Sequence, residues 1–415
     1  HLPPEDAIRV EEFINYFPQG YPGPRERDRA FAIHLEGAPS PFGGESYHLI
    51  RIGIQGRTVE AEERKDAVLT FVIDVSGSMD RENRLGLVKR ALRLLVDELR
   101  PSDQVAIVVY GTNAYTVLEP TYADRSRQGR DRILDAIDRL QPDGSTYAEA
   151  GLREGYRIAN RAFRQGAINR VILCSDGVAN VGATGAESIL AVIGEYAADD
   201  ITLSTVGFGL GNYNDVLMEQ LADQGNGSYA YVDTLDEARR IFVENLTGTL
   251  QVIAQDAKIQ VDFNPELVSR YRLLGYENRD VADEDFRNDA VDAGEVGAGH
   301  SVTALYEVKF HPEAEDERAS GRVMTVHVRY QDPDDLRVRE VARDHYRDEL
   351  HARFADATPI FRLTAAVAEY AELLRGSYWA REGSLDEVLV VAQMAAADLT
   401  TDGSSADRSI INRSG

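Results

Sequence analysis

The sequence contains little of several features that would each point to a definite class of protein. Its one cysteine, Cys174, excludes an internal disulfide, and its place inside the apolar run RVILC predicts a buried core thiol. No apolar run reaches the roughly 20 residues that cross a bilayer, so we expect no transmembrane segment. No histidine occurs between His48 and His300, which removes the commonest general base and the imidazole metal ligand from the middle of the chain.

Basic charge is also in short supply. Lys+Arg total 45 against 70 for Asp+Glu, and the formal net charge is -25. This charge repels phosphate backbones, so we expect no nucleic-acid partner. The carboxylates are spread along the whole chain, which fits a solvated acidic surface, cation binding or a basic partner. At 415 residues, 43% of them hydrophobic, the chain is long enough for two or three domains, each with its own core.

The middle of the chain alternates between strand and helix patterns. Nearly continuous apolar runs are typical of parallel strands that are covered on both faces. Between them, apolar residues recur at steps of three and four, as on one face of a helix. The alternation predicts an α/β domain with a doubly wound, mostly parallel sheet, which we bound at 63–250. Its strands are expected at 67–76, 104–110, 170–176, 201–209 and 228–232.

The segments on either side alternate apolar and polar residues, as in antiparallel strands with one solvated face. Two strands in 29–62 cannot form a core alone, and the same character returns in 251–345. We therefore predict one antiparallel β-sandwich that is split in the sequence, with the α/β domain inserted between its halves. An N-terminal helix and linker, 1–28, would precede it, and a C-terminal helical extension, 346–415, would follow it.

The stretch FVIDVSGSMD carries the strongest chemical signal. Asp74, Ser76 and Ser78 place three oxygen donors on a tight loop after an apolar strand, which suits a small hard cation. Thr146 and Asp176 lie on two other loops of the α/β domain. In a doubly wound sheet, ligands bind outside the carboxyl ends of the strands. If the strands that end at Asp74 and Asp176 are neighbours, the three loops meet in one crevice.

The charges of these groups predict an incomplete coordination shell. Two aspartates balance one divalent cation, while the three hydroxyls contribute neutral oxygens. The ion can therefore accept one more anionic ligand at an open position. A carboxylate or a water from outside could complete such a site.

The residues themselves resemble a known family. DVSGS, the threonine of GST and the later SDG are similar to the metal-ion-dependent adhesion site of von Willebrand factor type A domains. The resemblance implies Mg²⁺ as the bound ion, with Mn²⁺ or Ca²⁺ as alternatives. It places in the inner ligand shell Asp74, Ser76, Ser78 and Thr146, and it implies that Asp176 contributes directly or through water.

The resemblance extends beyond this site. PPEDAIRVEEFINYF, YRLLGYENR and the helical end look like the flanking regions of a group of bacterial exported, often lipid-anchored, proteins with a central type A domain. Inter-alpha-trypsin inhibitor heavy chains have a related plan. The likeness implies a location in the cell envelope or outside the cell. Because the chain starts at His1 without Met or a signal-peptide pattern, we expect a preceding segment to be missing from it.

These features predict a non-enzymatic, divalent-cation-dependent adhesion or scaffold module that captures an Asp or Glu side chain of a protein partner. One alternative is a structural envelope protein whose cation only stabilises loops, although a structural Ca²⁺ site would recruit more carboxylates. The other is a metal-dependent hydrolase, which would need a lysine or arginine to clamp a phosphoryl group. Neither loop around Ser76 or Asp176 contains one, and Arg81 and Arg84 are the nearest candidates.

A second acidic segment, DVADEDFRNDAVDAGEVG at 280–297, could hold Ca²⁺. Its spacing does not match an EF-hand loop, in particular the glycine at the turn. A solvated loop is the interpretation that the pattern favours.

Overall fold

The computed structural model divides into two compact units. The inserted unit comprises 58–253 and 294–299, and the flanking unit comprises 1–57, 254–293 and 300–415. The residues that the structure describes are 8–26, 29–42, 47–59, 63–81, 84–125, 128–177, 190, 193, 200–209, 215–245, 251–276, 286–288, 294–314, 320–381 and 383–401. The acidic segment 280–297 lies largely outside these residues.

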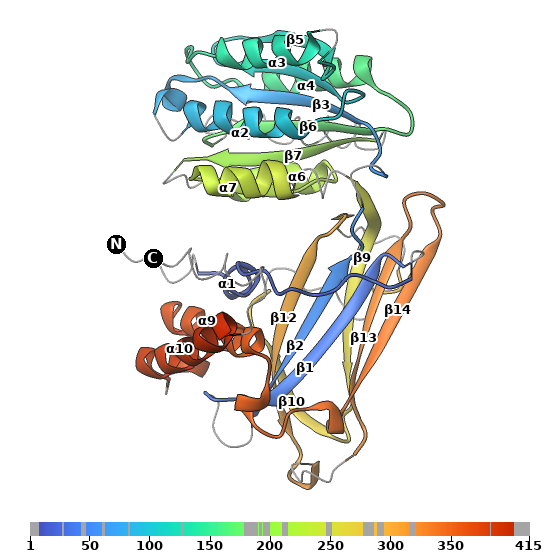
Figure 1. Cartoon of the computed structure of the whole chain (residues 1–415), viewed down its shortest axis with the longest axis vertical. Coiled ribbons are helices and arrows are strands. Elements are labelled where there is room, and N and C mark those ends of the chain that lie inside the picture. The colour runs from blue at the N-terminus through green and yellow to red at the C-terminus, as the bar shows by residue number, and fades with distance from the viewer. Residues whose placement is uncertain are drawn as a thin grey trace. The chain divides into compact units, whose positions relative to one another are not determined.

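The inserted unit is built on a six-stranded sheet in the order β5-β4-β3-β6-β7-β8 (Figure 1). All neighbours pair in parallel except β5, which is antiparallel to β4. Every residue of β3 and β6 is buried, which explains why both strands are continuous apolar runs in the sequence. The strands are β3 (Ala67–Asp74), β4 (Gln104–Tyr110), β5 (Ala114–Tyr122), β6 (Ile168–Ser175), β7 (Ile201–Phe208) and β8 (Tyr229–Val232).

Helices cover both faces of this sheet. Phe71 and Ile73 of β3 point into one core, with α2, α3 and α7, whereas Val72 points into the other, with α4 and α6. The doubly wound α/β prediction is therefore confirmed. The helices are α2 (Leu85–Glu98), α3 (Gly129–Asp138), α4 (Ala148–Ala162), α6 (Asp215–Gln224) and α7 (Leu235–Arg239), with the shorter turns η2 (Gly77–Asp80) and η3 (Arg240–Asn245).

The flanking unit contains two antiparallel sheets, in which the strands follow the orders β1-β2-β12-β10 and β9-β13-β14. Aromatic side chains join them: Phe31 meets Tyr330 at 5.1 Å between ring centroids, and Phe263 stacks on Tyr271 at 4.3 Å. The predicted split sandwich is thus present. Its strands are β1 (Phe31–Pro39), β2 (Tyr47–Gly56), β9 (Val252–Phe263), β10 (Val268–Leu273), β12 (Ser301–Phe310), β13 (Arg322–Gln331) and β14 (Val338–Tyr346). The short strand β11 (Val296–Gly297) falls in the stretch 294–299 of the inserted unit.

The outer face of the first sheet is less solvated than the alternating pattern predicts. Leu49 of β2 and Leu305 of β12 pack in one core with helices α1 (Val10–Asn15) and α9 (Pro359–Leu374). A C-terminal helix, α10 (Leu385–Thr401), packs on α9. Short turns complete the unit, namely η5 (Pro312–Ala314), η6 (Arg347–Glu349), η7 (Phe354–Asp356) and η8 (Tyr378–Ala380).

No helix among the described residues is long and apolar enough to cross a membrane.

Candidate metal centre

The site lies where two neighbouring parallel strands end. β3 pairs with β6, so Asp74 at the end of β3 lies beside the last residues of β6, and Asp176 follows them. The chain leaves β3 towards α2 on one face of the sheet, while Leu190 and Ile193, which follow β6, pack on the opposite face. This divergence is the switch point at which open α/β sheets bind ligands.

The loop that carries Thr146 is fastened to the loop that carries the serines. The backbone N–H of Gly77 donates to the carbonyl of Gly144 at 2.9 Å. Gly144 has a φ of +70°, and a Cβ there would overlap Oγ1 of Thr112, so only glycine fits. Thr146 stands two residues further on, partly exposed, just before α4. All three loops named in the sequence therefore converge on one edge of the sheet.

The carboxylate of Asp74 is fully buried and oriented by two serines. Its Oδ1 accepts the backbone N–H of Ser76 at 2.8 Å, and its Oδ2 accepts the hydroxyl of Ser175 at 2.9 Å. Burial raises the pKa of Asp74, the hydrogen bonds oppose that rise, and the charge of Asp176 adds to it. A positive counter-charge would stabilise the ionised form of a carboxylate buried in this way.

The two loop hydroxyls have the spacing of metal ligands. The Oγ atoms of Ser76 and Ser78 form a hydrogen bond at 3.0 Å, a separation that two ligands of one ion would also have. Mg²⁺ takes octahedral ligands at about 2.0–2.1 Å, which puts adjacent ligands at about 3 Å from each other. The pair therefore fits two neighbouring positions on one ion. Among the described residues, no group of three or more His, Cys, Asp or Glu could hold a metal, so a metal centre here would depend on the hydroxyls.

A buried tyrosine lies next to Asp74. Tyr110 ends β4, the other neighbour of β3, and is fully buried. Burial and then the charge of Asp74 raise its pKa well above the ordinary value, so the phenol stays neutral. Its hydroxyl has no hydrogen-bond partner of normal geometry within the described part of the chain.

Of the two nearest arginines, one reaches the site. Nη1 of Arg84 contacts Oδ2 of Asp176 and donates to the carbonyl of Ser78 at 2.9 Å. Gly209, with a φ of +96°, makes room for the arginine stem, because a Cβ there would lie 2.8 Å from Cγ of Arg84. Arg81 is exposed. A guanidinium is therefore part of the centre, although neither motif loop supplies it.

Three residues that our sequence interpretation did not select thus belong to the centre: Ser175, Tyr110 and Arg84. Ser175 is the first residue of the SDG motif and could have been chosen for its place before Asp176. Tyr110 could have been found as the last residue of a predicted strand. Arg84 was named only as one of the two arginines nearest to the motif loops, as a possible clamp for a phosphoryl group.

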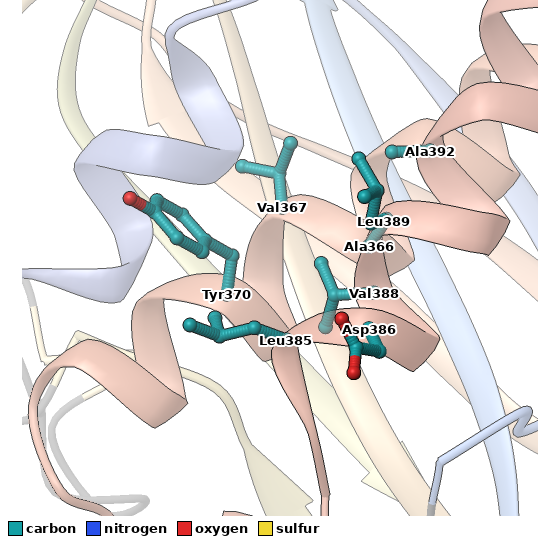
Figure 2. A pocket seen from close by; sticks show the side chains of 8 residues that line it. All are labelled: Ala366, Val367, Tyr370, Leu385, Asp386, Val388, Leu389 and Ala392. Carbon is teal, nitrogen blue, oxygen red and sulfur yellow. The ribbon is translucent and has the colours of Figure 1, made fainter.

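A pocket in the flanking unit lies between α9 and α10 (Figure 2). Ala366, Val367 and Leu389 line it, and Tyr370 stands at its side. Asp386 is the one charged side chain among the residues that line it. The pocket therefore offers apolar contact but no group of side chains for catalysis or metal binding.

Comparisons with known proteins identify the families that the chain matches. The family model for the von Willebrand factor type A domain matches 69–247, the model "Uncharacterized protein YfbK, C-terminal" matches 248–411, and a model described as "von Willebrand factor" matches 1–51. Type A domains generally mediate protein–protein interaction.

The chain is also similar to individual proteins. The chain is 36% identical to "Uncharacterized protein YfbK" of Escherichia coli over 96% of its own length and 71% of that protein. It is 29% identical to mouse inter-alpha-trypsin inhibitor heavy chain H2 over 44% of its own length and 20% of the relative. A solved von Willebrand factor type A protein from Catenulispora acidiphila aligns over 92% of this chain and 91% of its own, at 16% identity and a TM-score of 0.49. The chain belongs to the YfbK family of proteins, which have a central von Willebrand factor type A domain.

Proposed function

We propose that this protein is a divalent-cation-dependent protein-binding module of the cell envelope or the cell exterior. Asp74, Ser76, Ser78 and Thr146 would hold Mg²⁺, with Asp176 contributing directly or through water. Mn²⁺ or Ca²⁺ could replace it. When bound, the ion supplies a Lewis-acidic position for an anionic oxygen. The partner is a protein that presents an Asp or Glu side chain to this position.

The 3.0 Å spacing of the Ser76 and Ser78 hydroxyls carries the proposal. It is supported by the carboxylate of Asp74, which is held by two hydrogen bonds and whose ionised form a counter-charge would stabilise. The location in the envelope rests on the family resemblance.

The two alternatives fit the site less well. A cation that only ties loops together has little to add, because backbone hydrogen bonds such as Gly77 to Gly144 already join them. A phosphohydrolase would use Arg84 as its clamp, but that guanidinium is engaged by Asp176 and by the carbonyl of Ser78. The inserted unit has no histidine to act as a general base. We therefore favour a non-enzymatic role.

The test is Mn²⁺ binding, followed by electron paramagnetic resonance, in wild type, Asp74→Ala and Asp80→Ala. Asp80 is an exposed aspartate on the same loop and provides the matched control. Asp74→Ala should weaken binding by at least about 100-fold, more than the 10- to 100-fold typical of losing a residue that only supports a ligand. Asp80→Ala should bind as wild type does.

Capture of proteins from an envelope extract should likewise be lost in EDTA and restored by Mg²⁺. Equal Mn²⁺ binding by the two variants would contradict the proposal that Asp74 belongs to a metal centre. Unfolding of Asp74→Ala would support a structural cation, and Mg²⁺-dependent hydrolysis of p-nitrophenyl phosphate by wild type would support the hydrolase.

A further inference from the structure

The guanidinium of Arg84 lies inside the candidate metal centre, where nothing in the ligand set requires it. We propose that Arg84 couples the cation to the partner carboxylate: it weakens cation binding when no anion is present and makes cation and carboxylate bind cooperatively. The proposal rests on the metal centre proposed above and assigns the residue that makes this centre demand an acidic ligand.

Arg84 occupies a position that is costly for a cation. The residue is 9% exposed and stands at the N-cap of α2, where the partial positive charge of the helix end disfavours a further positive charge. Its Nη1 is held by Asp176 and by the carbonyl of Ser78. Its Nε is buried and has no hydrogen-bond partner within the described residues. The guanidinium is thus fixed, charged and not saturated with acceptors.

Arg84 changes the net charge of the loaded site from zero to one positive charge. Without Arg84, the carboxylates of Asp74 and Asp176 would neutralise a divalent ion, and the loaded site would have little demand for an anion. With Arg84, the loaded site keeps one net positive charge in a largely buried place, where charge is poorly screened. A carboxylate from outside removes that excess. The ion and the carboxylate therefore each make binding of the other more favourable, and the effect is reciprocal.

Asp176 has a second consequence for the same coupling. The carboxylate that is expected to help hold the ion already has a cationic partner in Arg84. A divalent ion must therefore share Asp176 with the guanidinium, which lowers the affinity for the ion alone. Removing one charge from a buried pair frees the other. Loss of Arg84 should consequently strengthen cation binding while it weakens the response to an anion.

The experiment measures Mn²⁺ affinity by calorimetry with and without saturating acetate. In wild type, acetate should raise Mn²⁺ affinity by at least about 5-fold, the lower end of typical coupling between sites. Arg84→Gln should bind Mn²⁺ alone more tightly than wild type by a similar factor and should lose most of the acetate effect. Arg81→Gln removes the same charge from an exposed side chain three residues earlier and should behave as wild type.

A third variant separates charge from packing. Arg84→Lys keeps a positive charge, so it should retain the acetate effect. If Arg84→Gln and Arg81→Gln show the same Mn²⁺ affinity and the same response to acetate, Arg84 is a structural ion pair and the inference is wrong. If wild type and Arg84→Gln both fail to bind Mn²⁺ with or without acetate, the metal centre itself is wrong. Loss of the acetate effect in Arg84→Lys despite a wild-type circular dichroism spectrum would also overturn the role of charge.

Discussion

At the scale of single residues, the centre depends on side chains that orient its ligands. Asp74 can present a lone pair to an ion in a fixed direction because Ser76 and Ser175 hold its two oxygens. Ser175 is itself fixed, since its hydroxyl accepts the backbone N–H of Gly177 at 3.1 Å. Such supporting hydrogen bonds set both the orientation and the basicity of a metal ligand.

Ser175→Ala should therefore weaken Mn²⁺ binding by about 10-fold, because one oxygen of Asp74 loses its donor and the carboxylate can turn. It should also lower the free energy of unfolding by about 1–3 kcal/mol, since a buried acceptor is left unpaired. Ser204→Ala is the matched control: Ser204 is buried in β7, and its hydroxyl has no partner among the described residues. Titration with Mn²⁺ and urea denaturation check both effects. Wild-type Mn²⁺ affinity in Ser175→Ala would show that Asp74 is oriented without this hydroxyl.

The residues of the centre that could be predicted from the sequence are those that lie close together along the chain. Asp74, Ser76 and Ser78 share one tight loop, so their spacing alone places three oxygens together. The partnership of Arg84 with Asp176 joins residues 92 positions apart. It depends on β3 and β6 being neighbours and on the space beside Gly209, and neither is visible in local sequence.

At the scale of elements, α4 positions the third loop. The helix begins two residues after Thr146 and lies against β3 and β4. Glycines allow this close approach: a Cβ on Gly151 would lie 2.5 Å from Cδ1 of Tyr110, and one on Gly155 would overlap Cγ2 of Val72. Their spacing of four places both on the face that meets the sheet.

Gly155→Ala should consequently destabilise the inserted unit, although alanine favours helix by up to about 1 kcal/mol over glycine. Overpacking against a β-branched side chain in a central strand costs about 1–3 kcal/mol, so the net loss should be about 1 kcal/mol once the gain in helix propensity is subtracted from the middle of that range. Asn160→Ala, on the exposed face of α4, changes helix propensity without the clash and should stabilise slightly. Thermal unfolding followed by circular dichroism measures both variants. A higher melting temperature for Gly155→Ala would show that α4 can move away from β3.

The sequence predicted the strands that are buried on both faces of the sheet and missed the edge strand. β3, β4, β6, β7 and β8 are within a few residues of their expected bounds, because strands covered on both faces are continuous apolar runs. β5 was missed. It is an edge strand with exposed residues and Pro120 inside it, so it lacks the apolar run of a central strand, and its pairing with β4 is interrupted by two register shifts.

At the scale of the whole molecule, the chain forms two compact units, and the flanking unit is assembled from three stretches of sequence. The sandwich could be predicted as a split domain because β1 and β2 have too few strands to be stable without partners. Its pairing is non-local, since β2 lies between β1 and β12 and residues about 250 positions apart are in register, such as Gln55 with Ser301. The covering of this sheet by α1 and α9 could not be predicted, because it needs the three-dimensional placement of both chain ends.

The flanking unit also contains a cluster of charges whose pH dependence can be measured. Arg272 of β10 pairs with Glu307 of β12 and Glu372 of α9. Beside them, burial raises the pKa of Glu369 to about 7, helped by the charges of Glu372, Glu307 and Glu387 and opposed by Arg272. The guanidinium of Arg272 lies 5.2 Å from the ring centroid of Trp379, the one tryptophan of the chain. The fluorescence of Trp379 therefore reports on this unit.

Glu369→Gln should stabilise the flanking unit at pH 8 and leave it unchanged near pH 4. In the unfolded chain this carboxyl titrates near 4.5, whereas in the folded protein it titrates near 7. Between these values the folded state binds the additional proton, so its stability falls as the pH rises through the window and the loss is complete above it. The side chain is half-buried, so the gain at pH 8 should be roughly 1–2 kcal/mol, below the value for full burial. Urea denaturation followed by Trp379 fluorescence at both pH values measures it, with the exposed Glu313→Gln as the control. Equal stabilisation by Glu369→Gln at pH 4 and pH 8 would mean that packing, not ionisation, sets the cost of this glutamate.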